Sequence, residues 1–244
     1  MNTPLVVVDN VSKRYKKAEE YSLQQVSFTI FRGDRFGILG PNGAGKTTLI
    51  SILCGIMHLS SGDVTYNSSE LKHNIIGFVP QDFAFYNELT ASQNLEYFGA
   101  LYNLSRKEIK ERSENVLTLL GLSNVANKKV KTFSGGMKRR LNLAIGILHD
   151  PSVLFLDEPT VGVDIQSKNA IIQFLHKLNK QGTTIIYTSH HLSEAEEFCN
   201  KIAILDYGKL IAFDEISALK ETHEAGTLMD VILKLTGEGY RDHV

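Results

Sequence analysis

The fold of this chain is decided by one stretch of sequence, Gly40-Pro41-Asn42-Gly43-Ala44-Gly45-Lys46-Thr47. It fits the pattern G-x-x-x-x-G-K-[ST] of phosphate-binding loops. The apolar run Arg35–Leu39 before it predicts a strand, and the segment Lys46–Ile56 after it has the spacing of a helix. The pattern requires this context, so nucleotide binding is favoured over the alternative of a glycine-rich turn that only joins a strand to a helix.

The residue types in this stretch suit a chain of phosphates. Glycines let the backbone wrap closely around phosphate groups with its N–H groups pointing inward, and the N-terminus of the following helix adds partial positive charge. The Lys46 ammonium can reach the β- and γ-phosphates, and the Thr47 hydroxyl is placed to ligate Mg²⁺. We therefore predict a nucleotide site at this loop.

Two adjacent acids, Asp157 and Glu158, follow the apolar run Val153–Leu156. Open parallel sheets bind ligands at such strand ends. We predict that Asp157 faces the Mg²⁺ held by Thr47 and that Glu158 is the base that polarises water for in-line attack on the γ-phosphate. An exposed acidic turn that caps the next helix is the alternative, and the apolar run before the acids makes it less favoured.

Predicted strands and helices alternate along much of the chain. We expect strands at Leu5–Val8, Ser27–Ile30, Arg35–Leu39, Ile75–Val79, Val153–Leu156, Thr184–Thr188 and Lys201–Leu205. We expect helices at Lys46–Ile56, Ser92–Tyr102, Ser105–Leu120, Ser134–Leu148, Ile165–Asn179 and Leu192–Cys199. The alternation in the first and last thirds predicts an α/β fold with a mostly parallel sheet, and residues from about 84 to 150 read as a helical insertion.

The composition of the 244 residues, 43% of them hydrophobic, is that of a globular protein. Its 26 Lys and Arg against 27 Asp and Glu give a net charge of −1, which argues against attachment to nucleic acid or anionic lipid through overall charge.

Cys54 and Cys199 lie far apart in the sequence, so neither a disulfide framework nor a zinc site is predicted. No apolar run approaches the roughly 20 residues that cross a bilayer, and no secretory signal is evident. We expect a chain that stays inside the cell and does not span a membrane by itself.

Further motifs follow the phosphate loop in a fixed order. They are Gln81 in Val79-Pro80-Gln81-Asp82, then Phe133-Ser134-Gly135-Gly136-Met137, Asp157-Glu158, Val161-Gly162-Val163-Asp164 and Thr188-Ser189-His190. In this order and spacing the chain resembles the ATP-binding subunit of ATP-binding-cassette (ABC) transporters over nearly its whole length. The resemblance implies a P-loop NTPase fold with a mostly parallel sheet core, an inserted helical subdomain and an antiparallel β portion near the N-terminus.

The resemblance also implies a division of the chain. Residues 1–244 would form a single nucleotide-binding domain. Within it, residues 1–83 and 151–220 would form the ATP-binding α/β core, residues 84–150 the helical subdomain with the signature motif, and residues 221–244 a short C-terminal extension.

The family's functional residues carry over to the matching positions. Gln81 resembles the loop glutamine that contacts Mg²⁺ and the attacking water, so the resemblance implies Mg²⁺ ligands at Thr47, Gln81 and Asp157. His190 resembles the switch histidine that holds the γ-phosphate, and the register of T-S-H favours it over His191, which we expect to begin the next helix. Catalytic roles therefore fall to Glu158, His190 and Gln81. Expected ATP-binding residues are Tyr15, which resembles the aromatic that stacks on adenine, and Gly40, Pro41, Asn42, Gly43, Ala44, Gly45, Lys46, Thr47 and Thr48.

The signature motif implies a shared site. In the family, residues such as Ser134, Gly135 and Gly136 face ATP bound by the other subunit, and Asp164 lies in the dimer loop. Met137 stands where the commoner signature has glutamine, so its side chain cannot make the same hydrogen bonds. The resemblance implies a head-to-tail pair of such chains, a second copy or a homologous subunit, around two ATP molecules with Mg²⁺.

Six basic residues surround the signature, and two interpretations of them stay open. They are Lys128, Lys129, Lys131, Lys138, Arg139 and Arg140. A run of this kind is either a solvated basic face or a positive field that guides the triphosphate of the partner subunit.

The resemblance implies a separate membrane permease as a partner and a position on the inner, cytoplasmic face of the cell membrane. Aromatic residues gather just after Gln81, and we expect Phe83, Phe85 and Tyr86 to meet the permease, whereas Phe78, Tyr97 and Phe98 are expected in the helical core. The segments Asp157–Asp164, His190–Cys199 and Gly226–Gly237 look most like the exporter branch of the family.

Two other functions are alternatives to transport. ABC ATPases that act on DNA or ribosomes carry long coiled-coil insertions or two fused cassettes, whereas this chain has one cassette and no sustained heptads. No nucleic-acid partner is therefore expected. A catalytically silent regulatory subunit is disfavoured because Lys46, Glu158 and His190 are all present.

Overall fold

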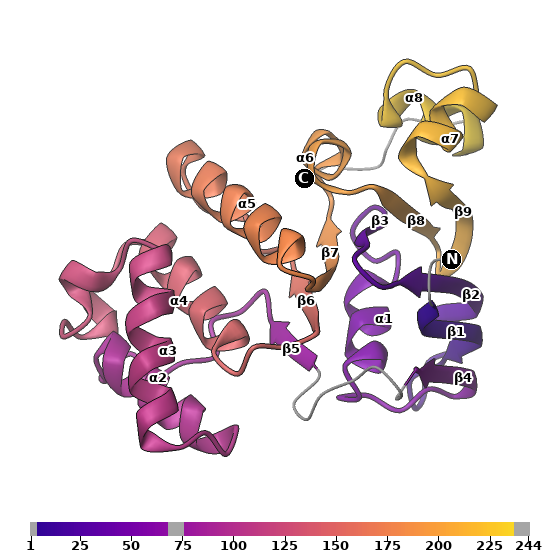
Figure 1. Ribbon diagram of the computed structural model, residues 1–244. Coiled ribbons are helices and arrows are strands. Elements are labelled where there is room, and N and C mark those ends of the chain that lie inside the picture. The colour runs from indigo at the N-terminus through magenta and orange to yellow at the C-terminus, as the bar shows by residue number, and fades with distance from the viewer. Residues whose placement is uncertain (1–3, 68–75, 237–244) are drawn as a thin grey trace. The chain divides into compact units, whose positions relative to one another are not determined.

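The computed structural model describes residues 4–67 and 76–236, and its chain divides into two units (Figure 1). The first contains residues 1–71 and 184–244, and the second contains residues 72–183. The domain boundaries expected from the sequence, at residues 84, 151 and 221, stay a prediction. Ile75, at the start of one expected strand, and residues 237–244 of the expected C-terminal extension lie outside the described residues.

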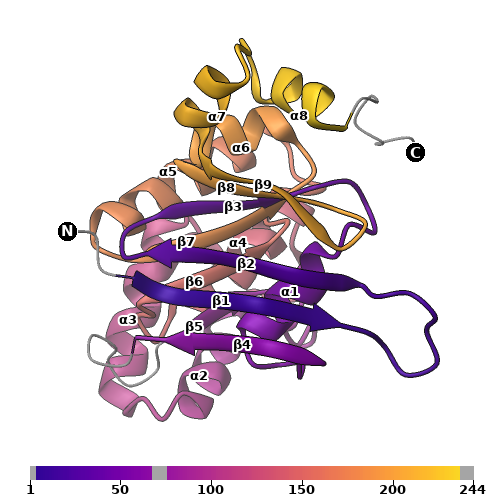
Figure 2. The ribbon, with the colours of Figure 1, turned by 90° about the vertical axis from the view of Figure 1, so that its right-hand side faces the viewer.

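The first unit contains a three-stranded antiparallel sheet. Its order is β2 (Leu23–Phe31), β1 (Pro4–Lys13) and β4 (Ser61–Tyr66), which lie side by side in Figure 2. Four further strands pair in the order β7 (Thr184–Ser189), β3 (Arg35–Leu39), β8 (Lys201–Asp206) and β9 (Lys209–Glu215). β7, β3 and β8 are parallel, and β9 is antiparallel to β8. The rings of Phe28, Phe36 and Phe213, from β2, β3 and β9, pack with centroids 5.1 to 6.0 Å apart and join the two groups of strands.

Four helices belong to the first unit: α1 (Lys46–Leu53), α6 (Leu192–Phe198), α7 (Ile216–Thr222) and α8 (Leu228–Thr236). The carboxylate of Glu196 on α6 accepts hydrogen bonds from the Lys220 ammonium at 2.7 Å and from the Leu228 backbone N–H at 3.1 Å. This one side chain therefore ties the C-terminal helices α7 and α8 to α6.

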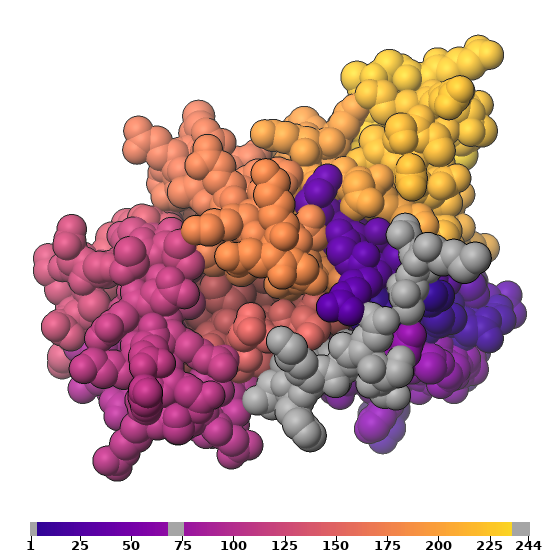
Figure 3. Space-filling view, in the orientation of Figure 1, coloured from indigo at the N-terminus to yellow at the C-terminus, as the bar shows by residue number. Residues whose placement is uncertain are grey.

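The second unit combines a parallel strand pair with helices. β5 (Ile76–Val79) pairs with β6 (Val153–Asp157), whose five residues are all buried, as expected of a strand covered on both faces. The helices are α2 (Ala91–Leu101), α3 (Arg106–Leu119), α4 (Gly135–Ile147) and α5 (Ile165–Lys180), with short 3₁₀ turns η2 (Ser123–Val125) and η3 (Val130–Thr132). The segments that carry α2 and α3 form one continuous packed mass in the space-filling view (Figure 3).

Capping boxes define where α2 and α3 begin. Thr90 accepts a hydrogen bond from the Gln93 backbone N–H while the Gln93 side chain accepts one from the Thr90 N–H, and Ser105 and Glu108 repeat the arrangement. Each box satisfies two backbone donors that a helix N-terminus leaves without partners. These caps fix the helical segment that follows β5 in the chain.

The structure confirms the expected α/β fold with parallel strands, an inserted helical segment and antiparallel strands near the N-terminus. Every predicted strand and helix is present, with boundaries shifted by a few residues. Among the elements that the structure describes, the strands β4 and β9, the helices α7 and α8 and the two 3₁₀ turns were not predicted. β4 lacks the apolar alternation that marks a strand, whereas the short apolar run Leu210–Phe213 in β9 is a strand signal that the prediction did not include. Within the described residues, no helix has both the length and the apolar character needed to cross a membrane.

Candidate nucleotide site

The phosphate loop connects β3 to α1 in the first unit. Gly40 has φ +152° and Gly45 has φ +105°, backbone conformations that residues with a side chain rarely adopt. A Cβ atom on Gly40 would lie 2.2 Å from the Leu205 carbonyl oxygen, and one on Gly45 would lie 2.6 Å from the Ser22 carbonyl oxygen. Both positions therefore require glycine, because the loop curls tightly against neighbouring backbone.

Lys46 is the buried cation of this loop. Its side chain is only 6% exposed, and its ammonium donates hydrogen bonds to the carbonyl oxygens of Gly40 at 2.7 Å and Pro41 at 3.1 Å. The charge thus lies inside the curve of the loop. Thr47, the next residue, is exposed, which leaves its hydroxyl accessible to a metal ion.

Tyr15 lies beside the same loop. Its hydroxyl is 3.1 Å from the Thr48 hydroxyl oxygen, and its ring is 43% exposed. An exposed aromatic face close to a phosphate loop suits stacking on a base. A cavity of about 940 Å³ next to Gly43 is lined by Tyr21 and Tyr207 among others, which adds open space on this side of the loop.

His190 follows a strand that neighbours the phosphate loop. Leu39 at the end of β3 pairs in parallel with Ser189 at the end of β7, so Gly40 and His190 leave adjacent strand ends. His190 is half-buried, whereas His191 is exposed and is the N-cap residue of α6. The expectation that His191 begins the next helix is confirmed.

The candidate catalytic carboxylate lies in the second unit, beside the candidate loop glutamine. Val79 on β5 pairs in parallel with Leu156 on β6, so both motifs leave adjacent strand ends. The Gln81 side-chain amide donates a hydrogen bond to the Glu158 carboxylate at 3.3 Å. Asp157 and Glu158 are buried, at 3% and 8% exposure, and Glu158 has the unusual φ of +49°. Burial of two neighbouring carboxyl groups together with backbone strain is typical of a functional site.

The signature motif begins a helix, as predicted. Ser134 is the N-cap of α4 and accepts a hydrogen bond from the Met137 backbone N–H at 3.3 Å. Ser134 and Gly135 are exposed, so a hydroxyl and the N-terminus of a 13-residue helix face solvent. This arrangement can bind an anion.

Asp164 begins the neighbouring helix α5. Its carboxylate accepts hydrogen bonds from the Ser167 backbone N–H and the Ser167 hydroxyl, both at 2.9 Å, and these bonds lower the pKa of Asp164. The residue expected in the dimer loop is therefore also the N-cap of a helix.

Comparison with known sequences identifies the family of this chain. The family model described as "ABC transporter" matches residues 23–161, and a model described as an AAA domain matches residues 129–196. The linearmycin resistance ATP-binding protein LnrL of Bacillus subtilis is 40% identical over 241 residues, which cover 96% of this chain and 73% of that protein. This chain belongs to the ABC transporter family. The daunorubicin resistance ATP-binding protein DrrA3 of Streptomyces coeruleorubidus is 34% identical over 239 residues, covering 96% of this chain and 75% of that protein.

Solved structures of ABC proteins share the fold. The ATP-binding subunit of an ABC transporter aligns with a TM-score of 0.85 and 26% identity over 95% of this chain and 99% of that one. The ATP-binding cassette MJ0796, a dimer in a post-hydrolysis state with ADP and Pi, aligns with a TM-score of 0.78 and 29% identity over 86% of this chain and 98% of that one. This ABC chain is accordingly an ATP-binding subunit with ATPase activity.

The ABC site residues fall into two sets, one in each unit. The first unit holds Tyr15, the loop from Gly40 to Thr48, and His190. The second holds Gln81, Ser134, Gly135, Gly136, Asp157, Glu158 and Asp164. Within each set, strand pairing or hydrogen bonds bring residues from distant positions together, and the individual roles stay predictions.

The donor set expected for Mg²⁺ consists of the Thr47 hydroxyl, the Gln81 amide and the Asp157 carboxylate. All three offer oxygen, the ligand type that Mg²⁺ prefers, and Mg²⁺ at nucleotide sites takes most of its other ligands from phosphate and water. Among residues 4–67 and 76–236, no group of three or more His, Cys, Asp or Glu is arranged to hold a metal ion. The three oxygen donors fit the few protein ligands that a nucleotide-bound Mg²⁺ takes.

Most of the six basic residues near the signature form hydrogen bonds or ion pairs within the chain. The Lys131 and Lys129 ammonium groups lie 2.9 and 3.7 Å from the Glu88 carboxylate, which lowers the pKa of Glu88. Arg140 donates to the Leu120 carbonyl oxygen at 2.9 Å, and Arg139 is buried with carbonyl partners of its own. Of the six basic residues, four thus have structural partners, which weakens the idea of a free positive field. Sequence reasoning missed these partners because they lie far away along the chain.

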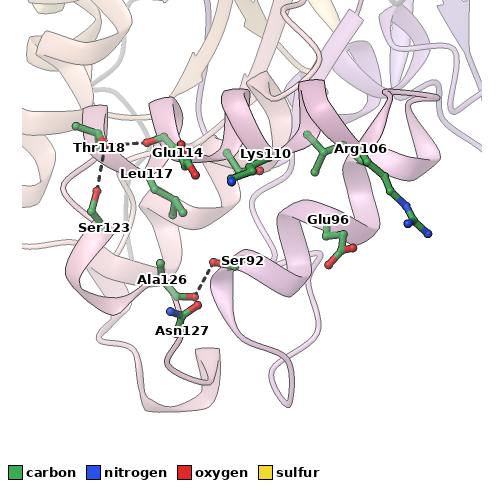
Figure 4. Close-up of a pocket in the computed structure, with 12 residues that line it drawn as sticks. Ser92, Glu96, Arg106, Lys110, Glu114, Leu117, Thr118, Ser123, Ala126 and Asn127 are labelled. Atoms are coloured by element: carbon green, nitrogen blue, oxygen red, sulfur yellow. Dashed lines mark hydrogen bonds between the residues drawn. The ribbon is translucent and has the colours of Figure 1, made fainter.

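A cavity of about 730 Å³ elsewhere in the second unit is a separate feature. Figure 4 shows α2 and α3 on its sides, with the acids Glu96 and Glu114 and the bases Arg106 and Lys110 among its lining. Hydrogen bonds from Ser92 to the Ala126 carbonyl oxygen and between Thr118 and Ser123 close one end. None of the predicted site residues lines it, so this cavity is not the nucleotide site.

Replacing Gly136 with alanine should lower stability. The added Cβ would lie 2.4 Å from the Ser167 hydroxyl oxygen, so the hydroxyl would have to leave Asp164 or the two helices would have to separate. Overpacking of this kind costs about 1–3 kcal/mol. Thermal unfolding should show a lower midpoint for Gly136→Ala, with partial recovery in the double variant Gly136→Ala/Ser167→Ala. A Gly136→Ala protein as stable as the wild type would contradict the close approach of α4 and α5.

Proposed function

We propose that this chain hydrolyses ATP as one half of a head-to-tail pair and thereby drives a separate membrane permease, in the direction of export. The observation that carries the proposal is the hydrogen bond from Gln81 to Glu158. It joins the residue expected to respond to the permease with the expected catalytic base. The second half of the pair is either another copy or a homologous ATP-binding subunit.

In this proposal ATP lies with its phosphates in the loop from Gly40 to Thr47 and its adenine against Tyr15. Lys46 supplies the positive charge toward the β- and γ-phosphates. Thr47, Gln81 and Asp157 hold Mg²⁺, which when bound neutralises charge on the phosphate oxygens. His190 donates a hydrogen bond to the γ-phosphate.

Glu158 accepts the proton of the attacking water. Its buried carboxylate accepts a hydrogen bond from the Gln81 amide, which orients it. A positioned base of this type contributes about 10²–10⁴-fold to a rate. The proposal therefore assigns the chemical step to Glu158 and its orientation to Gln81.

Pairing of two chains is supported by the exposure of the signature residues. Ser134 and Gly135 face solvent at the N-terminus of α4, where an anion held by another molecule can reach them. The solved cassette MJ0796 is a dimer. In our proposal the Ser134 hydroxyl and the α4 N-terminus bind the γ-phosphate of ATP held by the partner subunit.

Export is supported by the names of the relatives. They include resistance proteins for linearmycin and daunorubicin, and the Nod factor export ATP-binding protein I of Ralstonia nicotianae, 36% identical over 231 residues. Transport of any such compound needs a membrane partner. We therefore propose that the chain works on the cytoplasmic face of the cell membrane, attached to a permease.

The experiment that tests this function is isolation of the native complex. The tagged chain is purified from solubilised membranes of its own cells, and its partners are identified by mass spectrometry. A co-purified integral-membrane permease is the expected result. Ribosomal proteins or DNA in its place would overturn the transport proposal in favour of a non-transport ABC ATPase.

The aromatic residues after Gln81 form the surface on which we propose that the permease docks. Phe83 is 41% and Tyr86 49% exposed, and the rings of Phe83 and Phe85 stack with centroids 5.3 Å apart. Tyr97, expected in the helical core, is 42% exposed, and its hydroxyl accepts a hydrogen bond from the Tyr86 hydroxyl at 3.2 Å. The expectation for Tyr97 is therefore wrong, and the tyrosine extends the exposed surface.

Alanine at Phe83, Phe85 and Tyr86 should release the permease. Buried aromatic anchors at interfaces contribute about 2 kcal/mol or more each, so the recovery of permease should fall at least 10-fold. The matched control is Leu119→Ala, which removes a half-exposed leucine at the end of α3. Undiminished permease recovery by a folded triple variant, or equal loss in the control, would contradict this docking surface.

A further inference from the structure

Arg139 is a buried cation on the signature helix α4. Its side chain is 5% exposed. One terminal nitrogen of the guanidinium donates to the Gln81 carbonyl oxygen at 2.7 Å and approaches the Pro80 carbonyl oxygen at 3.5 Å. The other donates to the Val161 carbonyl oxygen at 3.3 Å. A single planar fork therefore contacts the backbone of two separate loops.

The surroundings of this guanidinium are unusual for a buried charge. It lies over the Phe83 ring, 4.8 Å from the ring centre, and its Nε finds no acceptor within the described part of the chain. Desolvation lowers the pKa of Arg139, while the charges of Asp82 and Glu158 act in the opposite direction. A buried cation held by carbonyl groups rather than by a carboxylate is costly for stability alone. This cost favours a role in function.

The two loops that Arg139 contacts both lead to site residues. Gln81 continues through its side chain to Glu158, the expected base. Val161 lies between Glu158 and Asp164, in the segment that ends at the N-cap of α5. At its other end, the signature helix begins at Ser134, which is expected to face the ATP of the partner subunit. Arg139 thus links the signature to the residues expected to hydrolyse the chain's own ATP.

The neighbouring Arg140 makes a different set of contacts. It donates to the Gly136 carbonyl oxygen within α4 and to the Leu120 carbonyl oxygen at the end of α3. These bonds hold α4 against another helix and touch neither loop. Substitution of Arg140 is therefore a matched control: it removes an arginine from α4 without removing a contact to either loop.

We propose that Arg139 is a positioning residue for ATP hydrolysis that couples the signature helix to the Gln81–Glu158 pair. When α4 is held by ATP on the partner subunit, the rigid guanidinium fork holds the carbonyl groups of Gln81 and Val161 at fixed positions. Binding of one ATP thereby aligns the residues that hydrolyse the other. The coupling rests on the proposed head-to-tail pair, because only there does Ser134 meet a second ATP.

The test compares Arg139→Gln, Arg139→Lys and Arg140→Gln in the full chain. Steady-state ATPase assays over a range of ATP concentrations give kcat, KM and the Hill coefficient, and thermal unfolding gives stability. We expect Arg139→Gln to lower kcat about 10–100-fold, since small misplacements of catalytic groups reduce rates to that extent. Its Hill coefficient should fall to 1. Its affinity for a fluorescent ATP analogue, measured for one chain, should be unchanged. Arg139→Lys should recover only part of kcat, because an ammonium cannot bridge both carbonyl groups, and Arg140→Gln should keep both kcat and the Hill coefficient.

Several outcomes would overturn the proposal. One is an equal fall of kcat in Arg139→Gln and Arg140→Gln, in proportion to lost stability. Another is a wild-type Hill coefficient in Arg139→Gln. If Arg139→Gln does not fold, wild-type kcat together with a wild-type Hill coefficient in Arg139→Lys would overturn the proposal. Failure of the proposed pair itself would be seen separately, as a hydrolysis-blocked Glu158→Gln chain with no ATP-dependent dimer in size-exclusion chromatography. A cooperative wild type with equally cooperative Arg139 variants would overturn the coupling by Arg139 and leave the proposed pair intact.

Discussion

Lys46→Ala should bind ATP at least 100-fold more weakly than the wild-type chain. The Lys46 ammonium is the buried charge within the phosphate loop, where it donates to the Gly40 and Pro41 carbonyl oxygens. In the ATP complex we expect two charge-assisted hydrogen bonds to phosphate oxygens in their place. Bonds of this type contribute about 1.5–3 kcal/mol each, and a total of about 3–6 kcal/mol corresponds to roughly 10²- to 10⁴-fold in affinity. Isothermal titration calorimetry measures the change directly.

A matched control separates this effect from a general loss of positive charge. Lys16 lies in an exposed segment of the same unit, so Lys16→Ala should bind ATP as the wild type does. Lys46→Arg should also bind weakly, because the larger guanidinium does not fit a side-chain site that is only 6% exposed. ATP affinity within a factor of about three of wild type in Lys46→Ala would refute the assignment of the phosphate loop.

The sequence predicts best those features whose signals are local. Arg35–Leu39 was expected as a strand and is β3 with the same bounds, because an apolar run and a glycine-rich turn define it without help from the rest of the chain. The start of α1 at Lys46 is equally local. The motif residues of the site are predictable for the same reason, since each motif is a short pattern of defined chemistry.

Two of the elements that were not predicted carry local signals. β9 forms a hairpin with β8 across the two-residue turn Tyr207-Gly208, in an antiparallel register in which Ala203 pairs with Phe213. α8 did carry a local signal that sequence reasoning passed over. Thr227 and Asp230 form a reciprocal cap at its start, the Thr hydroxyl accepting from the Asp230 N–H and the Asp230 carboxylate accepting from the Thr227 N–H.

The contacts that organise the site, by contrast, are distant in sequence. The hydrogen bond from Gln81 to Glu158 depends on the parallel pairing of β5 with β6, which no pattern within either segment specifies. Arg139 reads in the sequence as one member of a basic run, yet its burial and its carbonyl partners arise from packing of α4 against two loops. Motifs therefore name candidate residues, whereas their coupling becomes visible only in three dimensions.

Glu158→Gln should lower ATP turnover by about 10²–10⁴-fold and leave ATP binding intact. Glutamine has the shape of glutamate, and its amide oxygen can still accept the hydrogen bond from the Gln81 amide, so the site should keep its geometry. The amide cannot take a proton from water, so hydrolysis should stop after ATP has closed the pair. Phosphate release measures turnover, and size-exclusion chromatography with ATP and Mg²⁺ should show a stable dimer.

Two further variants show whether this dimer has the proposed cause. Glu197→Gln removes the charge of an exposed glutamate on α6 and should hydrolyse ATP at the wild-type rate without accumulating a dimer. Lys46→Ala/Glu158→Gln should stay monomeric with ATP, because the dimer forms around bound ATP and the phosphate loop no longer holds it. Turnover of Glu158→Gln close to wild type would exclude Glu158 as the base. A dimer that persists in the double variant would show that ATP is not what joins the two chains, so these two measurements judge the chemistry and the pairing independently.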